Sequence, residues 1–175
     1  MAFTIVNPTA GVMPINQTDS GVTQPGASSA TPTPPMYPGM IVRAVDPTVG
    51  EGEFILLAGV ASTAVGSCVV YDSLTFATTL APAGTNLPRN VAFAMAANTS
   101  ASTWGWYQIS GVAVAKKTSG LAIASNAAVG VKTAGLIAAT GSGKEVQGAL
   151  TIAKATTATT VRLMVNRPRM QGRIT

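Results

Sequence analysis

Short apolar runs of four to eight residues recur from about residue 39 onward, separated by glycine, serine, threonine, asparagine or proline. Runs of this length with such boundaries predict β-strands. The expected strands are 40–45, 53–60, 67–71, 91–96, 104–109, 112–116, 121–124, 128–131, 136–139, 145–152 and 160–166. Their number and regular spacing predict an all-β fold, a compact sandwich or barrel of short strands.

Helix is poorly supported in the same region. No window of about 12 residues has 3.6-residue periodicity without glycine or threonine interrupting it. The alanine-rich stretch 94–102 is the one place where helix propensity leaves a short helix open.

The first 38 residues have a different composition. They contain seven prolines and one charged residue, Asp19. Proline fixes φ and removes a backbone donor, so helix is excluded here and 31–38 favours polyproline II. Apolar residues are interspersed with the prolines, which predicts an extended arm that becomes ordered against a surface. The residues expected to make this contact are Phe3, Ile5, Val6 and Ile15.

We therefore divide the chain into a proline-rich arm (1–38), a β-rich body (39–168) and a basic C-terminal tail (169–175), with Pro168 expected to end the last strand. An extended arm of this length spans up to ~130 Å, against a radius of gyration of ~14 Å for the body. The arm is thus expected to reach past its own body onto a neighbour. Its deletion is expected to leave a folded body that has lost this binding.

Charge is unevenly distributed along the chain. Residues 1–88 hold one base and five acids, whereas residues 89–175 hold ten bases and one acid. This asymmetry favours an acidic partner or head-to-tail contact between subunits, although ordinary solvated charges explain it equally well. The bases are spaced singly, which argues against direct nucleic-acid binding. Arg167, Arg169 and Arg173 suit an ion-paired interface with another protein or another subunit.

Residues for catalysis are scarce. The chain has no histidine and a single cysteine, Cys68, so neither a Ser–His–acid triad nor a zinc site is expected. Glu51 and Glu53 fall in a GEGE stretch that is typical of a turn. The run 139–146 lacks the first glycine of a phosphate-binding loop and has Glu145 where a hydroxyl is needed, so we interpret it as a hairpin turn. We expect no enzyme, no catalytic residue, no cofactor and no metal.

Three aromatic residues lie close together in sequence. Trp104 and Trp106 fall on one face of a strand and Tyr107 on the other. We interpret them as an anchor in the core or a subunit interface, where aromatics supply most of the burial. The alternative is a stacking platform for glycans or bases.

Neither a membrane segment nor a secretion signal is expected. The uncharged stretch 54–71 is long enough to span a bilayer but is interrupted by glycine, serine and threonine. The N-terminal residues lack a basic segment followed by a continuous apolar one. A lone cysteine fits synthesis in a reducing cytoplasm.

Three stretches carry a family resemblance. RAVDPTVGEGEFILLAGVAST (43–63), GWYQISGVAVAKK (105–117) and VRLMVNRP (161–168) resemble the decoration, cement or minor head proteins of tailed bacteriophages. The resemblance implies a structural virion protein on the outer capsid surface that cements neighbouring coat subunits against internal DNA pressure. Its implied partners are the major capsid protein and further copies of itself, as a homotrimer or alternatively a homodimer. It would be made in the host bacterial cytoplasm. In this case the predicted arm and arginine contacts lie against the capsid or another subunit. The alternative function is a head-fibre or tail-associated host-recognition module that binds surface glycans through Trp104, Trp106 and Tyr107.

Overall fold

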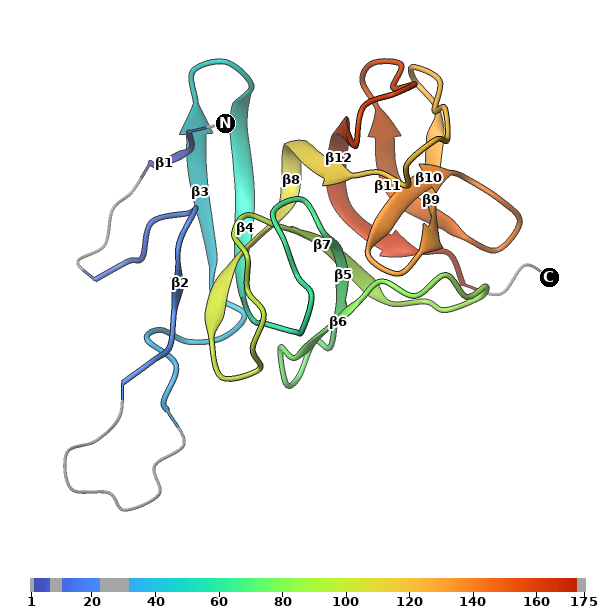
Figure 1. The fold of residues 1–175 in the computed structure, drawn as a ribbon. Helices are drawn as coiled ribbons and strands as arrows, with labels where there is room; N and C mark the ends of the chain where they lie inside the picture. The colour runs from blue at the N-terminus through green and yellow to red at the C-terminus, as the bar shows by residue number, and fades with distance from the viewer. Residues whose placement is uncertain (1, 7–10, 23–31, 173–175) are drawn as a thin grey trace.

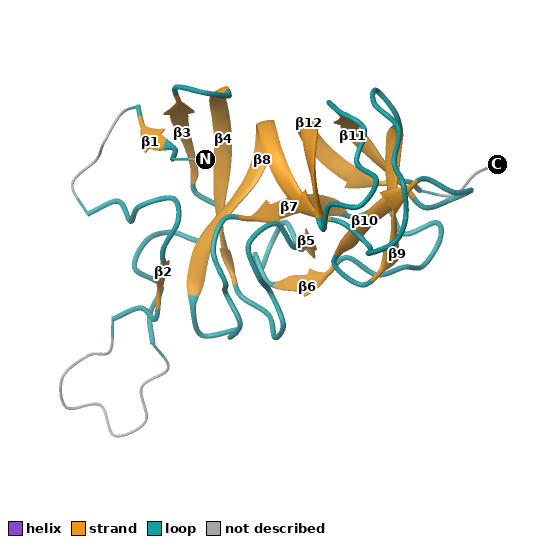
Figure 2. Cartoon of the chain, turned by 45° about the horizontal axis from the view of Figure 1, so that its top comes forward, coloured by secondary structure: helices purple, strands orange, loops and turns teal. Residues whose placement is uncertain are grey.

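The protein is an antiparallel β-structure throughout its described part. The computed structural model describes residues 2–6, 11–22 and 32–172, and these form twelve strands in one connected sheet and no helix (Figures 1 and 2). The strands are β1 (Thr4–Ile5), β2 (Thr18–Asp19), β3 (Ile41–Asp46), β4 (Gly50–Ala58), β5 (Cys68–Tyr71), β6 (Thr78–Leu80), β7 (Asn90–Ala94), β8 (Trp104–Lys116), β9 (Ala128–Thr133), β10 (Leu136–Ala139), β11 (Glu145–Thr151) and β12 (Thr160–Met170). The all-β prediction is confirmed. No helix of the described residues is long and apolar enough to cross a membrane.

The first lobe contains a sheet whose central strand, β4, is buried on both faces over residues 54–57. Its strands follow the order β1-β3-β4-β8-β7, and β5 and β6 continue it beyond β7. In the central strand β4, Phe54 and Leu56 point to one face while Ile55 and Leu57 point to the other, and all four are buried. Burial on both faces explains why this segment is a continuous apolar run rather than an alternating one.

Strand β8 connects this sheet to the rest of the molecule. Its first half pairs with β4 and its second half with β12. The register with β4 shifts between Glu53 and Phe54, close to Gly111, which has a φ of 90°. We predicted two strands, 104–109 and 112–116, but Gly111 bends one long strand instead of ending it. Glycine adopts this positive φ without the steric penalty of a side chain.

The second lobe is barrel-like. Strands β12, β11, β9 and β10 follow the second half of β8, and a parallel bridge between Lys117 and Ile137 brings β10 back to the end of β8. Their inward side chains, among them Ala113, Leu163 and Val131, are buried in a common core. We call residues 112–172 the barrel lobe (Figure 1, upper right).

Several boundaries differ from prediction. Stretch 121–124 is not a strand, because only Ile123 bridges to Ala155 there. Stretch 94–102 contains turns instead of a helix, and strands β1, β2 and β6 were not predicted. The turn 141–144 is confirmed, but it is not a hairpin, because the strands it joins, β10 and β11, lie on either side of β9.

The last strand does not end at Pro168. Arg169 and Met170 continue β12 and pair with Gln147 and Val146 of β11. The register shifts opposite Gly148, so the proline sits at an irregularity where a missing N–H breaks no ladder bond. The prediction that the tail begins at residue 169 is therefore wrong for its first residues.

Candidate interaction surfaces

The arm packs on its own body. The Phe3 ring meets Phe54 edge-on, with ring centroids 4.8 Å apart, and Met13 and Ile15 are buried. The indole Nε1 of Trp106 donates a hydrogen bond to the Met13 carbonyl at 2.8 Å. The prediction that the arm reaches past its body is wrong for its described segments. The reason is that this face of the sheet carries Phe54 and Trp106, which the arm covers.

The start of the arm is also held at the sheet edge. Ile5 is half-buried and pairs in β1 with Ala44 of β3, whereas Val6 is 49% exposed. The Ala2 N–H donates to the carboxylate of Asp46. Backbone N–H groups, first that of Thr48 at 2.8 Å, hold the pKa of Asp46 below its ordinary value. Of the four predicted arm contacts, only Val6 is left exposed for a partner.

The described residues between β2 and β3, 20–22 and 32–40, expose two large apolar side chains. Val22 and Thr33 pair with each other in an isolated bridge. Val22 is 63% exposed and Tyr37, in the proline-rich segment, is 88% exposed. Val22 and Tyr37 are thus more accessible to another molecule than Ile15, which we predicted as a contact.

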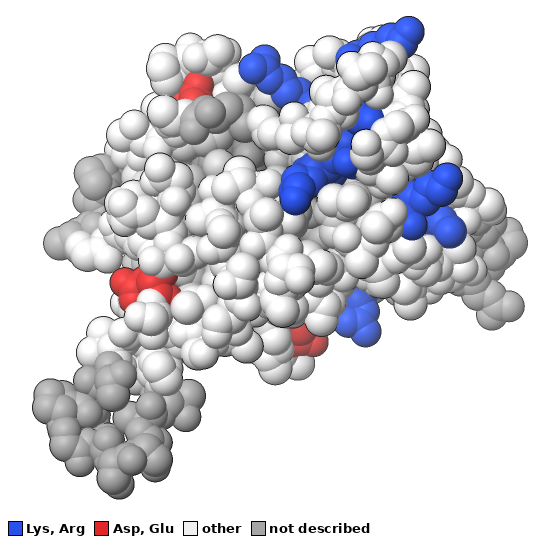
Figure 3. Space-filling view, in the orientation of Figure 1, with Lys and Arg blue, Asp and Glu red and all other residues white. Residues whose placement is uncertain are grey.

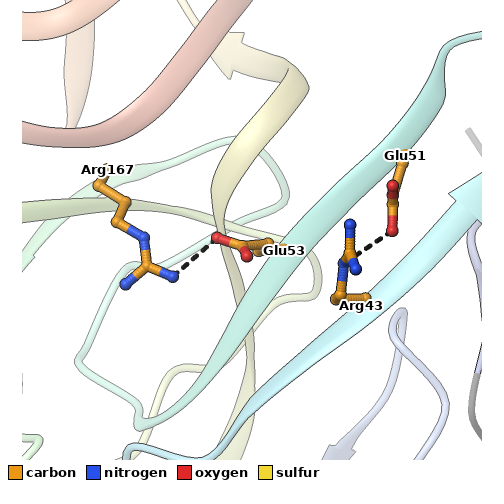
Figure 4. Close-up of polar contacts among 4 residues, drawn as sticks. All are labelled: Arg43, Glu51, Glu53 and Arg167. Atoms are coloured by element: carbon orange, nitrogen blue, oxygen red, sulfur yellow. Dashed lines mark hydrogen bonds and ion pairs between the residues drawn. The ribbon is translucent and has the colours of Figure 1, made fainter.

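A polar groove lies where the two lobes meet. Arg43 pairs with Glu51 at 2.8 Å, and Arg167 of β12 pairs with Glu53 of β4 at 2.9 Å (Figure 4). The groove has a volume of about 330 Å³, and its remaining lining consists of Gly52, Ser110 and Asn166. The GEGE stretch is part of β4 and not the predicted turn, so both glutamates project from one strand face. Both pairs are solvent-exposed, and such pairs contribute about 1 kcal/mol or less each.

Two of the three predicted arginines bind within the chain. Arg167 binds Glu53, and Arg169 Nε donates to Gln147 Oε1 at 3.3 Å. Arg173 lies outside the described residues.

No group of three side chains that could hold a metal ion occurs in the described part of the chain. Burial raises the pKa of the Cys68 thiol, which packs in the same core as the inward side chains of the barrel lobe.

The three aromatic residues are buried. Trp104 and Trp106 are 7% and 1% exposed on the face beneath the arm, and Tyr107 is fully buried on the opposite face. A glycan could not stack on them without displacing the arm or opening the core. The geometry gives no support to the recognition-module alternative.

The buried hydroxyl of Tyr107 is expected to make the folded protein less stable at alkaline pH. Burial raises the pKa of its hydroxyl to about 12, from an ordinary value near 10. A raised pKa means that the folded state holds the proton more tightly, so this stability is fully present below pH 10 and is lost as the pH rises towards 12. We expect the free energy of unfolding to fall by about 2 kcal/mol over this range from this group alone.

The measurement is urea unfolding at pH 9, 10 and 11 for the wild type and Tyr107→Phe. The variant should be less stable at pH 9, because it loses the hydroxyl contact with the Asn98 amide at 3.1 Å, but its stability should fall less steeply at higher pH. Equal slopes in the two proteins would contradict the assignment.

No protein-family model matches the chain, and no curated protein matches its sequence. The three stretches that carry the phage resemblance nevertheless have a defined place in the fold. They correspond to β3 and β4, to β8 and to β12, and these strands pair in succession as β3-β4-β8-β12.

The outward-facing apolar residues of the barrel lobe were not predicted as a surface. Met164, Leu150 and Ile152 are 51%, 51% and 40% exposed. The sequence does contain a signal for this surface. In 161–165 apolar residues occupy both faces of the strand, with Val161, Leu163 and Val165 on one face and Met164 on the other.

Proposed function

We propose that this protein is a non-enzymatic structural component of a tailed-phage virion. It binds the outer surface of the capsid and cements neighbouring coat subunits against the pressure of packaged DNA. Its partners are the major capsid protein and other copies of itself, in a homotrimer or alternatively a homodimer. It is made in the host bacterial cytoplasm and ends on the virion.

One observation carries most of this proposal. The three stretches with the phage resemblance, far apart in sequence, are neighbouring strands at the centre of one sheet. A resemblance spread over unrelated surface loops would carry less weight than one that coincides with the framework of the fold. The charge-poor, all-β body, with ion pairs and no assembled catalytic group in its polar groove, is compatible with a binding role.

Cementing also requires that binding be multivalent. A modest contact made by one copy becomes strong when an oligomer holds several coat subunits at once. The affinity of a cement protein for a complete shell should therefore greatly exceed its affinity for a single coat subunit.

The test is co-sedimentation of the purified chain with expanded shells assembled from the coat protein of the same virus. We expect saturable binding, with a copy number per shell that matches one class of symmetry axis. Unexpanded shells and isolated coat subunits serve as controls and should bind more weakly. Absence of saturable binding to expanded shells would contradict the proposal.

A further inference from the structure

The outer side of the barrel lobe carries three exposed apolar residues, Leu150, Ile152 and Met164, beside two half-buried valines, Val112 and Val114. Val112 of β8 lies opposite Met164 of β12, which in turn lies opposite Leu150 of β11. In the next row, Val114 lies opposite Arg162, whose carbonyl accepts a hydrogen bond from the N–H of Ile152 at 3.0 Å. We call these six residues the barrel face: Val112, Val114, Leu150, Ile152, Arg162 and Met164.

These outward side chains are not needed to fill the core. Their neighbours along the strands, such as Ala113, Leu163 and Val165, point inward and are fully buried or nearly so. The outward positions of a one-sided sheet are normally polar, yet Met164 and Leu150 are each 51% exposed. A contiguous exposed apolar patch of this kind typically marks an interaction site.

Basic residues surround this apolar row. Arg162 is exposed in its middle, Lys116 is half-exposed at one end of the same strands, and Lys154 is exposed in the loop between β11 and β12. Residues 112–172 contain eight bases and one acid. Most of the basic side chains visible in Figure 3 lie over this lobe, and the acidic ones lie mainly over the other. The partner that fits this surface therefore has carboxylates interspersed with apolar side chains.

Five of the six acids of the chain make hydrogen bonds or ion pairs within it, and the sixth, Glu145, belongs to the barrel lobe itself. Glu51 and Glu53 form the two ion pairs, and the carboxylates of Asp19, Asp46 and Asp72 accept backbone hydrogen bonds within their own turns. Two barrel faces brought together would juxtapose like charges, which opposes a symmetric contact between copies. Nucleic acid would use the bases but leave the valine, leucine and methionine side chains without a role.

We propose that the barrel face is the surface by which this protein docks on the coat, against a patch of the major capsid protein in which carboxylates are interspersed with apolar side chains. This inference rests on the proposed function. It moves the contact from the arm and from Arg167 and Arg169, which bind within the chain, to a surface that the described residues leave uncovered.

The test uses four variants of the full chain in the shell co-sedimentation assay. Met164→Asp places a charge in the apolar row, and Arg162→Glu reverses the central charge. The matched controls are Leu74→Asp, at an 89% exposed leucine between β5 and β6, and Lys132→Glu, at an exposed lysine on β9. Thermal unfolding of each variant, expected within a few degrees of the wild type because all four sites are exposed, shows that the fold is retained.

We expect both barrel-face variants to bind shells at least about tenfold more weakly, as central interface residues do, and both controls to bind like the wild type. If the wild type binds and Met164→Asp binds equally well, this inference is overturned while the proposed function stands. If the wild type does not bind, both fall. Binding of naked double-stranded DNA that is lost in Arg162→Glu, with shell binding kept in Met164→Asp, would instead assign the face to nucleic acid.

Discussion

Removal of residues 1–22 is expected to strip the protein of most of its stability. The deletion uncovers Phe54 and Trp106 and removes the buried side chains of Met13 and Ile15. Truncating one buried isoleucine or methionine costs about 2–5 kcal/mol, and a whole domain is stable by only about 5–15 kcal/mol. This outcome is opposite to the expectation, drawn from the sequence, that a body without its arm stays folded.

Urea unfolding followed by tryptophan fluorescence measures the effect directly. Trp104 and Trp106 both lie beneath the arm, so the truncated chain should also emit at longer wavelength in the absence of urea. A truncated chain with the urea midpoint and emission maximum of the wild type would contradict the prediction and would free the arm for a partner.

Two single substitutions separate packing from the loss of chain length. Ile15→Ala should lower the free energy of unfolding by about 2–4 kcal/mol, because Ile15 is 3% exposed. Val6→Ala should change it by about 0.5 kcal/mol or less, because Val6 is 49% exposed on the same arm. Equal effects at the two positions would show that the arm does not pack as described.

Local sequence predicted the strands well where apolar runs were bounded by breakers. Strands β3, β5, β7, β9 and β10 fall close to their predicted ranges, because such runs fit a pleated, buried surface whatever their partners are. The two-residue strands β1 and β2 could not be predicted in this way. Their backbone pairing depends on β3 and β8, which are distant in sequence.

The direction of the arm could not be predicted because it depends on a competition between surfaces. Its composition predicts a segment ordered against a surface, but it does not identify that surface. The face containing Phe54, Leu56 and Trp106 belongs to the same chain, and a surface tethered to the arm competes at a high effective concentration. The same limit applies to Arg167, whose partner Glu53 is 114 residues away.

The burial of the aromatic residues was easier to anticipate than the exposed barrel face. Large aromatics in an alanine-rich chain have few alternatives to the core. Which side chains form the barrel face depends on which alternating set in 161–165 points inward. One set is Val161, Leu163 and Val165, and the other is Arg162 and Met164. This choice is fixed by the curvature of the sheet and by the pairing of β12 with β8 and β11, not by the strand alone.

Gly111→Ala is expected to lower the free energy of unfolding by about 3 kcal/mol or more. The φ of 90° alone costs a non-glycine residue about 1–2 kcal/mol. A Cβ there would also lie 2.3 Å from the Glu51 carbonyl oxygen, which belongs to the backbone of β4 and cannot rotate away. Because this bend lets β8 pair with β4 and β12 at once, the substitution should loosen the joint between the lobes.

Gly120→Ala is the matched control for this prediction. Gly120 has a φ of 73°, but nothing lies within 4 Å of the position of its added Cβ, so backbone strain is the only cost. We expect it to lose about 1 kcal/mol, so the difference between the two variants in urea unfolding measures the clash at the joint. If both lose the same amount, β4 moves freely to accommodate the methyl group. The lobes would then be coupled mainly through β12, whose pairing with β7 and β11 does not depend on Gly111.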